Sequence, residues 1–292
     1  MERERMPQVR PGDTVALVAP AGPASPSALD KAAATLAGWG LTVKRFDSVR
    51  PVREYLANTD ARRAELFQLA WTDPSVTAVI AARGGYGTQR MLDLLDFPAL
   101  RAAGPKIFAG SSDLTAMHQA IAAHLGLPTL FSPMPAGTFF DDAAAEQLRR
   151  ALFTPEAVLP GGDPLVPGTA RGVLTGGNIA LLAAGIGTPE HQPPRAAIAI
   201  LEDIGEAPYR LDRMLTQLLR SGWFDGVRGI ALGSFTSCGD PADVRAVMLD
   251  RLAPLGVPIL GGLSFGHCPA ALTVPLGAEA VLDTRAGTLK TT

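Results

Sequence analysis

Short apolar runs alternate with stretches of helical periodicity along the first half of the chain. The apolar runs predict strands, and the periodic stretches between them predict helices. Strands are expected over residues 14–19, 41–46, 76–82 and 106–109, and helices over residues 28–39, 62–71, 88–95 and 114–124. This alternation predicts βαβ units, and therefore a mostly parallel sheet covered by helices.

A stretch rich in proline and glycine interrupts this pattern at residues 154–171. Such a composition disfavours both a helix and a central strand, so we expect a linker there. It separates an N-terminal domain, residues 1–153, from a smaller mixed C-terminal domain, residues 172–292. In the second domain we expect a glycine-flanked segment at 172–186, strands at 196–201 and 229–233, and helices at 209–221 and 241–252.

Charge and composition narrow the possible partners. The 292 residues hold 26 Lys and Arg against 28 Asp and Glu, so the basic excess typical of nucleic-acid binding is missing and a small molecule is the expected partner. No apolar run approaches the roughly 18 residues needed to cross a membrane. The charged N-terminal segment lacks a signal-like apolar stretch, which predicts a cytoplasmic protein. Cys238 and Cys268 show no metal-site or disulfide pattern and are expected as free thiols.

A candidate nucleophile stands where a predicted strand runs into a helix. Residues 106–117 have the form of a nucleophile elbow, with Ser112 at the turn. The amide of Asp113 would then lie at a helix N-terminus, where it can stabilise an oxyanion. Leu114 replaces the second glycine of the GxSxG pattern, so the motif alone is weak. The alternative is that Ser111, Ser112 or Asp113 simply caps the helix.

A glycine turn, residues 83–87, follows another predicted strand. It lacks the third glycine of a dinucleotide fingerprint, because Arg90 occupies that position, and the chain has no GxxxxGK[ST] motif. Phosphate binding is therefore not expected. The turn is either an ordinary strand-to-helix connection or the source of a second oxyanion donor beside Ser112.

A serine nucleophile needs a base, and the chain has four histidines. His118 and His124 lie on the predicted helix after Ser112 and are displaced along its axis, and His191 lies in a proline-rich loop. His267 lies in a glycine- and proline-flanked loop after an apolar strand, a typical position for a catalytic side chain. The alternative is a structural or surface histidine.

The third partner would be a carboxylate that orients the imidazole. Glu202 ends the apolar run 196–201, and a buried strand seldom ends on an acid that has no partner. Asp203, Glu206 and Asp212 compete for the role, and the local pattern does not decide among them.

Seven sequence segments, taken together, resemble the LD-carboxypeptidases, a family of serine peptidases that also contains the microcin immunity hydrolases. The resemblance spans nearly the whole chain, with the motifs in the family's order. They are Gly12–Gly22 (GDTVALVAPAG), Arg83–Gly87 (RGGYG), Gly110–Asp113 (GSSD), Gly176–Asn178 (GGN), Leu201–Met214 (LEDIGEAPYRLDRM), Phe265–His267 (FGH) and Leu272–Gly277 (LTVPLG).

The resemblance implies that Ser112 is the nucleophile, His267 the base and Glu202 the orienting acid. The amides of Gly85 and Asp113 would form the oxyanion hole. The implied fold is α/β, with an N-terminal flavodoxin-like parallel sheet that carries helices on both faces and a smaller C-terminal mixed α/β domain. Because the nucleophile and its partners come from different domains, the active site is expected at the domain interface.

The implied reaction is release of the terminal D-alanine from a murein tetrapeptide, by hydrolysis of the amide after the L-centre of diaminopimelate or lysine. The resemblance implies peptidoglycan recycling by a homodimer that needs no metal and no organic cofactor. Asn178, Tyr86 and Arg213 are the expected substrate-binding residues, with Arg210 as an alternative for the terminal carboxylate. Ser111 departs from the family, which usually has an aromatic residue there, and could alter substrate preference.

Three other functions compete with this one. A microcin-type hydrolase would cleave peptidyl or aminoacyl nucleotides with the help of an aromatic loop between nucleophile and acid, but no tryptophan lies between Trp71 and Trp223. A two-lobed binding protein without chemistry would not need a complete Ser, Glu and His set. A glutamine amidotransferase-like domain would need a cysteine where Ser112 stands.

Overall fold

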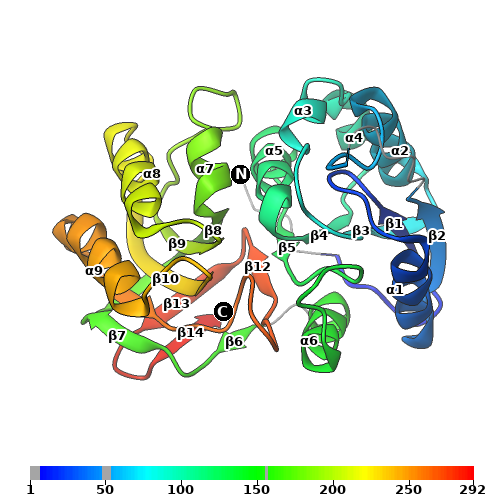
Figure 1. The fold of residues 1–292 in the computed structure, drawn as a ribbon. Helices are drawn as coiled ribbons and strands as arrows, with labels where there is room; N and C mark the ends of the chain where they lie inside the picture. The colour runs from blue at the N-terminus through cyan, green and yellow to red at the C-terminus, as the bar shows by residue number, and fades with distance from the viewer. Residues whose placement is uncertain (1–6, 48–53, 155–156) are drawn as a thin grey trace.

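The computed structural model describes residues 7–47, 54–154 and 157–292, which form two lobes, each built on its own β-sheet (Figure 1). Residues 1–6, part of the segment that suggested a cytoplasmic protein, lie outside the described residues. Residues 155–156 of the expected linker also lie outside them. Within the described ranges, no helix is long and apolar enough to cross a membrane.

The strands that the N-terminal lobe contributes to its sheet are parallel and lie in the order β2-β1-β3-β4-β5. This is the flavodoxin-like order, so the predicted architecture is confirmed. Four strands coincide with the predicted ones to within a residue or two, and β5 is an additional strand of three residues. The strands are β1 (Thr14–Val18), β2 (Thr42–Phe46), β3 (Val76–Ala81), β4 (Ile107–Gly110) and β5 (Thr129–Phe131).

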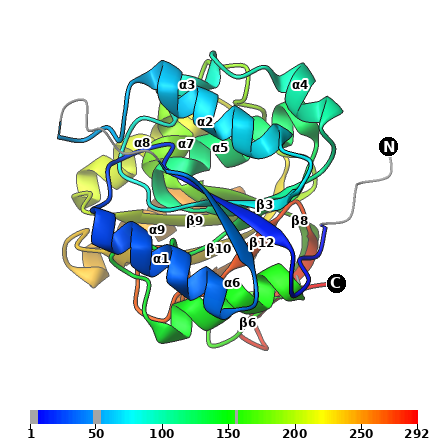
Figure 2. The same ribbon diagram turned by 90° about the vertical axis from the view of Figure 1, so that its right-hand side faces the viewer.

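Helices cover both faces of this sheet (Figure 2). Val15 and Leu17 of β1 pack with one set of helices, whereas Ala16 and Val18 pack with the other, because successive strand residues point to opposite faces. One face carries α1 (Pro26–Gly38) and α6 (Asp142–Phe153), and the other carries α2 (Asp60–Thr72), α3 (Gln89–Leu92), α4 (Phe97–Ala102) and α5 (Thr115–Ala120). Of these, α4 and α6 were not predicted, and the helix predicted over 88–95 is reduced to the single turn of α3.

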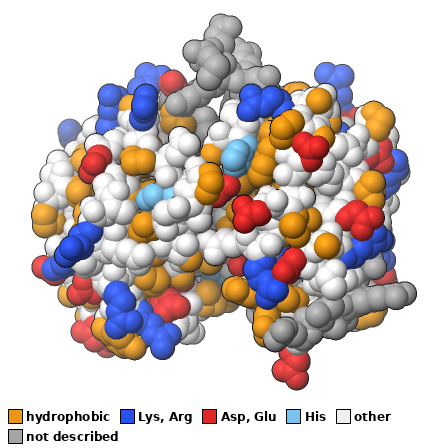
Figure 3. Space-filling view, turned by 90° about the horizontal axis from the view of Figure 1, so that it is seen from above, with side chains coloured by type: hydrophobic (Ala, Val, Ile, Leu, Met, Phe, Trp, Pro, Cys, Tyr) orange, Lys and Arg blue, Asp and Glu red, His pale blue; other side chains and the backbone are white. Residues whose placement is uncertain are grey.

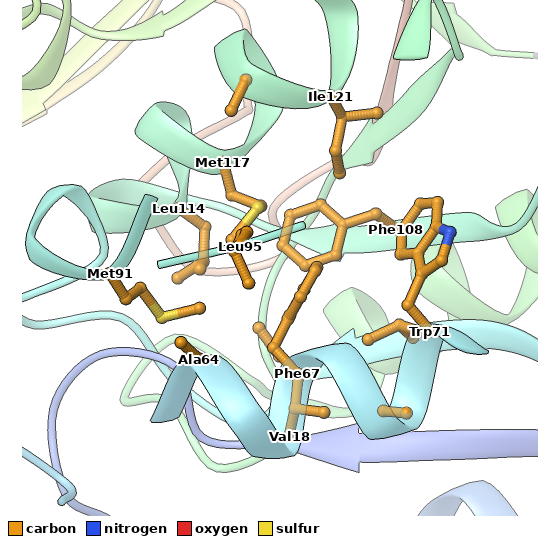
Figure 4. Packing of buried hydrophobic residues seen from close by; sticks show 14 of the residues in the cluster. Val18, Ala64, Phe67, Trp71, Met91, Leu95, Phe108, Leu114, Met117 and Ile121 are labelled. Atoms are coloured by element: carbon orange, nitrogen blue, oxygen red, sulfur yellow. The ribbon is translucent and has the colours of Figure 1, made fainter. Parts of the chain in front are cut away.

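Aromatic side chains fill the core between α2 and the sheet (Figure 4). The Phe67 ring lies 5.9 Å from both the Trp71 and the Phe108 rings, and all three are fully buried. Leu114 and Met117 pack into the same cluster. Burial of each such side chain contributes about 1.5–3 kcal/mol, so the segment that follows Ser112 is firmly anchored.

The C-terminal sheet has the order β6-β14-β13-β8-β9-β10-β11-β7, with a parallel centre and antiparallel edges. Its helices all lie against one face, in a second core. The strands are β6 (Val158–Leu159), β7 (Asp163–Val166), β8 (Thr169–Asn178), β9 (Ala197–Ile204), β10 (Val227–Thr236), β11 (Ile259–Gly261), β13 (Glu279–Asp283) and β14 (Thr288–Thr291), and the helices are α7 (Ile179–Ala184), α8 (Pro208–Arg220) and α9 (Pro241–Leu252).

The predicted linker contributes two short strands, β6 and β7, one at each edge of the C-terminal sheet, and the first residues of β8. Pro164 lies inside β7, where a missing backbone donor is tolerated because the strand has only one neighbour. The expectation of a segment without strands was therefore wrong: an edge strand tolerates proline, and the last three residues, 169–171, lie after the prolines and begin the central strand β8.

One C-terminal strand, β12 (Val274–Leu276), joins the N-terminal sheet. It pairs antiparallel with β5, with Val274 opposite Phe131. Phe131 also belongs to a hydrophobic cluster with Ile200 and Leu276, so the two lobes share a core. The exact domain limits stay a prediction, because this C-terminal segment completes the N-terminal lobe.

The surface carries charges of both signs. Figure 3 shows Lys and Arg side chains interspersed with Asp and Glu over one face of the molecule, without a large area of a single sign. On this face, any attraction for a charged ligand has to come from individual side chains.

Candidate active site

Ser112 follows β4 at a sharp turn. Its φ of 61° lies in the left-handed region, which costs a residue with a Cβ about 1–2 kcal/mol. Such strain is a feature of nucleophile elbows, because it lifts the serine off the end of the sheet. The Ser111 side chain makes no capping bond, and the Asp113 carboxylate is bound elsewhere. The helix-cap alternative for these residues is therefore not realised.

The glycine turn after β3 lies directly against Ser112. A Cβ on Gly84 would lie 3.0 Å from the Ser112 Cβ and 3.2 Å from its Oγ, so this close approach depends on glycine. The Thr88 amide donates a 2.8 Å hydrogen bond to the buried Asp113 carboxylate and ties the turn to the elbow. The amides of Gly85 and Asp113 donate no hydrogen bond to another described residue. Both donors are thus available to a ligand.

A histidine–carboxylate pair lies at the end of β9. Glu202 is fully buried, and its Oε2 lies 2.6 Å from His267 Nδ1. Burial lowers the pKa of His267, but the hydrogen bond and the charge of Glu202 outweigh it, so the net pKa is raised. Since Nδ1 is occupied by Glu202, Nε2 is the nitrogen left to exchange a proton. The Phe139 ring packs edge-on against the imidazole at 5.9 Å.

Asn178 links this pair to the elbow. Its backbone amide donates to the Thr115 hydroxyl at 3.1 Å, three residues after Ser112, and its side-chain Nδ2 donates to Glu202 at 3.2 Å. The strand register supports the second contact, because Asn178 and Glu202 are directly opposite in β8 and β9. The two lobes therefore meet at the groups that the sequence singled out.

Asn178 has partners other than the substrate carboxylate expected for it. Its side chain is 3% exposed, its Nδ2 also donates to Asp203 at 2.9 Å, and its Oδ1 accepts from the Leu181 amide at 3.2 Å. Burial raises the pKa of Asp203 to about 6, with the neighbouring Glu202 charge adding to the shift. The sequence treated Asp203 only as a competitor of Glu202, and its contact with Asn178 could not be seen from local pattern.

The other competing acids have partners away from His267. Glu206 lies 3.5 Å from Arg210, and Asp212 accepts a hydrogen bond from the Thr216 hydroxyl. Among the acids that the sequence proposed, Glu202 is the one whose carboxylate contacts the histidine.

Of the remaining histidines, His118 and His124 make side-chain contacts of a structural kind. Fully buried His118 lies 2.8 Å from both the Thr129 hydroxyl and the Gly110 carbonyl, and burial lowers its pKa to about 4. His124 stacks on a phenylalanine and pairs with Glu190 at 2.9 Å. His191 has its Nε2 buried without a partner in the described chain.

The expected substrate-binding residues on the surface are more loosely held. Tyr86 is 50% exposed and packs edge-on against Tyr55, with ring centroids 5.7 Å apart. Arg213 is exposed, and its guanidinium lies 5.3 Å from the centre of the Tyr209 ring.

Gly266, next to His267, offers a test of the local packing. Its φ is 93°, and a Cβ there would lie 2.5 Å from Glu202 Oε2. We expect Gly266→Ala to destabilise the fold by about 2 kcal/mol or more and to displace Glu202. The matched control is Gly256→Ala, which has φ 68° and no neighbour within 4 Å, and should cost about 1 kcal/mol. Denaturant unfolding measures both, and equal losses would contradict the packing argument.

A strained serine and a histidine–carboxylate pair in a two-lobed α/β fold are the features of a serine hydrolase. Comparison with known families agrees: the N-terminal domain of LD-carboxypeptidases matches residues 15–132, and the C-terminal domain matches residues 171–282. The chain belongs to the LD-carboxypeptidase family.

The sequences of several named proteins align with nearly the whole chain. A putative carboxypeptidase of Streptomyces coelicolor is 52% identical over 99% of this chain and 96% of its own length. The murein tetrapeptide carboxypeptidase of Pseudomonas aeruginosa is 34% identical over 92% of each. The crystal structure of muramoyltetrapeptide carboxypeptidase from Oxalobacter formigenes superposes with a TM-score of 0.84 at 32% identity, covering 95% of this chain and 97% of that one.

A further solved structure, an MccF-like protein from Bacillus anthracis, has a TM-score of 0.88 at 22% identity and covers 99% of both chains. At that identity the likeness supports the shared fold alone. Together with the sheet topology, these structures confirm the predicted α/β architecture of two lobes.

Proposed function

We propose that this protein is a serine carboxypeptidase that releases the terminal D-alanine from murein tetrapeptides by hydrolysing the L,D-amide bond. The observation that carries the proposal is the 2.6 Å contact between His267 and Glu202, joined through Asn178 and Thr115 to the strained Ser112. The names of the relatives supply the substrate class.

In the proposed mechanism, Ser112 Oγ attacks the carbonyl carbon of the scissile amide while its proton moves to His267 Nε2. Glu202 holds the proton of His267 on Nδ1 and stabilises the imidazolium that forms. The amides of Gly85 and Asp113 donate to the oxyanion, and each such donor contributes roughly 3–4 kcal/mol to transition-state stabilisation.

Collapse of the tetrahedral intermediate breaks the carbon–nitrogen bond, and His267 returns the proton to the departing D-alanine nitrogen. A water molecule then attacks the acyl-enzyme ester, with His267 again as the base, which frees the tripeptide and regenerates Ser112. The same imidazole thus acts as base and acid in both halves of the reaction.

Mass spectrometry of the protein incubated with L-Ala-γ-D-Glu-meso-diaminopimelate-D-Ala tests this function. We expect loss of one D-alanine and no other cleavage. A lysine-containing tetrapeptide and an aminoacyl nucleotide serve as parallel substrates. Cleavage of the nucleotide alone would instead favour a microcin-type hydrolase, and cleavage of none would contradict the proposal.

We expect kcat/KM to rise with pH, because His267 must be neutral to accept the serine proton. The Glu202 contact raises the pKa of His267 above its ordinary value of 6.5, so the midpoint of this rise should lie above pH 6.5. Asp203, with a pKa of about 6, titrates nearby, so the profile is measured in parallel with Asp203→Asn. A midpoint below pH 6.5 in both proteins would contradict the assignment.

The cellular role follows from the substrate and remains part of the proposal. A cytoplasmic protein that trims murein tetrapeptides would act in peptidoglycan recycling. The homodimer implied by the family resemblance stays a prediction, and light scattering coupled to size exclusion would measure it.

A further inference from the structure

Arg83 lies at the catalytic turn without a role in the mechanism above. It directly follows β3 and precedes Gly84, the residue packed against Ser112. Its Nη1 donates a 2.7 Å hydrogen bond to the Pro23 carbonyl. Its Nη2 lies 3.9 Å from the position that a Cβ on Gly85 would occupy. The guanidinium is therefore fixed beside a proposed oxyanion donor.

The charge of Arg83 is not neutralised by a carboxylate within the part of the chain that the structure describes. Nearby arginines differ in this respect, since Arg63 and Arg90 both bind Asp60. Arg83 is half-buried, and among the described residues only the Pro23 carbonyl accepts a hydrogen bond from one of its five donors. A partly buried guanidinium with free donors is suited to a carboxylate, which it binds through two parallel hydrogen bonds.

A carboxypeptidase has to recognise the free carboxylate at the end of its substrate, and the residues expected to do so are otherwise engaged. The Asn178 side chain is buried against Glu202 and Asp203. Arg210 pairs with Glu206, and Arg213 lies exposed over Tyr209. Arg83, by contrast, directly precedes Gly84, the residue that packs against Ser112.

We propose that Arg83 binds the terminal carboxylate of the peptide substrate and so restricts the enzyme to the last bond of the chain. This inference rests on the proposed function. The Pro23 carbonyl accepts a hydrogen bond from Nη1, which leaves the donors on Nη2 and Nε for the substrate carboxylate. With the carboxylate bound there and the scissile carbonyl at the Gly85 amide, the terminal residue is held across the turn at both ends.

The test compares two substrates, the tetrapeptide acid and the same peptide with a C-terminal carboxamide. In the wild type we expect kcat/KM to favour the acid by about 10–100-fold, the usual effect of a charge-assisted hydrogen bond. Arg83→Gln keeps a donor for the Pro23 carbonyl but removes the charge, and should abolish most of this preference by slowing the acid alone. Arg83→Lys keeps the charge and should retain part of the preference.

Arg220→Gln, at the exposed end of α8, is the matched control and should behave as the wild type. The inference is overturned if Arg83→Gln keeps the wild-type preference or slows both substrates equally, or if Arg213→Gln abolishes it instead. A wild type that cleaves neither peptide would remove the proposed function, and the inference with it. If Arg83→Gln fails to fold, the acid-to-carboxamide ratio of kcat/KM is compared between Arg83→Lys and Arg220→Gln. A ratio in Arg83→Lys as large as that in Arg220→Gln overturns the bidentate contact.

Discussion

Replacing Ser112 with alanine is expected to lower kcat for D-alanine release by about 10⁴-fold or more, with little change in the affinity for the tetrapeptide. In the proposed mechanism the Ser112 hydroxyl oxygen forms the acyl-enzyme, so no neighbouring group can take its place. Removing it leaves the oxyanion donors and the binding contacts, which account for the residual rate. Mass spectrometry of released D-alanine measures the loss, and calorimetric titration with the tetrapeptide measures the affinity.

The neighbouring hydroxyl provides the control for this variant. Ser111 is buried and makes no capping bond, so Ser111→Ala should keep activity within about tenfold of the wild type. A serine-directed phosphonate should add its mass to the wild type and to Ser111→Ala but not to Ser112→Ala. Appreciable turnover by Ser112→Ala would remove this residue from the mechanism.

The second large loss of activity is expected when the Glu202 carboxylate is replaced by an amide. Glu202→Gln preserves the size of the side chain and an acceptor for Asn178, yet we expect kcat to fall about 10³–10⁴-fold. The glutamine amide would donate to His267 Nδ1 and so drive the imidazole proton to Nε2, the nitrogen that has to accept the serine proton. Loss of the negative charge should also move the acid limb of the pH profile to lower pH.

Asp203→Asn is the matched control for Glu202→Gln. Asp203 is adjacent in sequence and also buried, but it contacts Asn178 and the Ala180 amide rather than the histidine. Its loss should therefore slow the reaction only about tenfold or less. A defect as large as that of Glu202→Gln would make Asp203 the orienting acid.

The fold was predictable wherever local pattern decides the structure. β1 and β3 coincide with apolar runs bounded by turn residues, and both fall within a residue of the expected limits. β5 was missed because it has three residues, and its pairing with β12 joins segments far apart in sequence. The signal for α6 was available, since Asp141 caps a helix with apolar residues at positions 144, 148 and 152.

The candidate site was likewise predictable only in the features that local sequence pattern determines. Local pattern nominated Ser112, Glu202 and His267 but left alternatives open for each, and the family resemblance chose among them. The contact of Asn178 with Glu202 depends on the register of β8 against β9, which the sequence does not reveal. Similarly, only the positions of the described carboxylates reveal that none of them pairs with Arg83.

Because β12 leaves the C-terminal lobe to pair with β5, the two halves of this protein cannot be exchanged independently among relatives. A hybrid gene that joined this N-terminal half to a foreign C-terminal half would bring a foreign strand against Leu130 and Phe131. Recombination within the family is therefore constrained to crossovers that keep this strand pair matched.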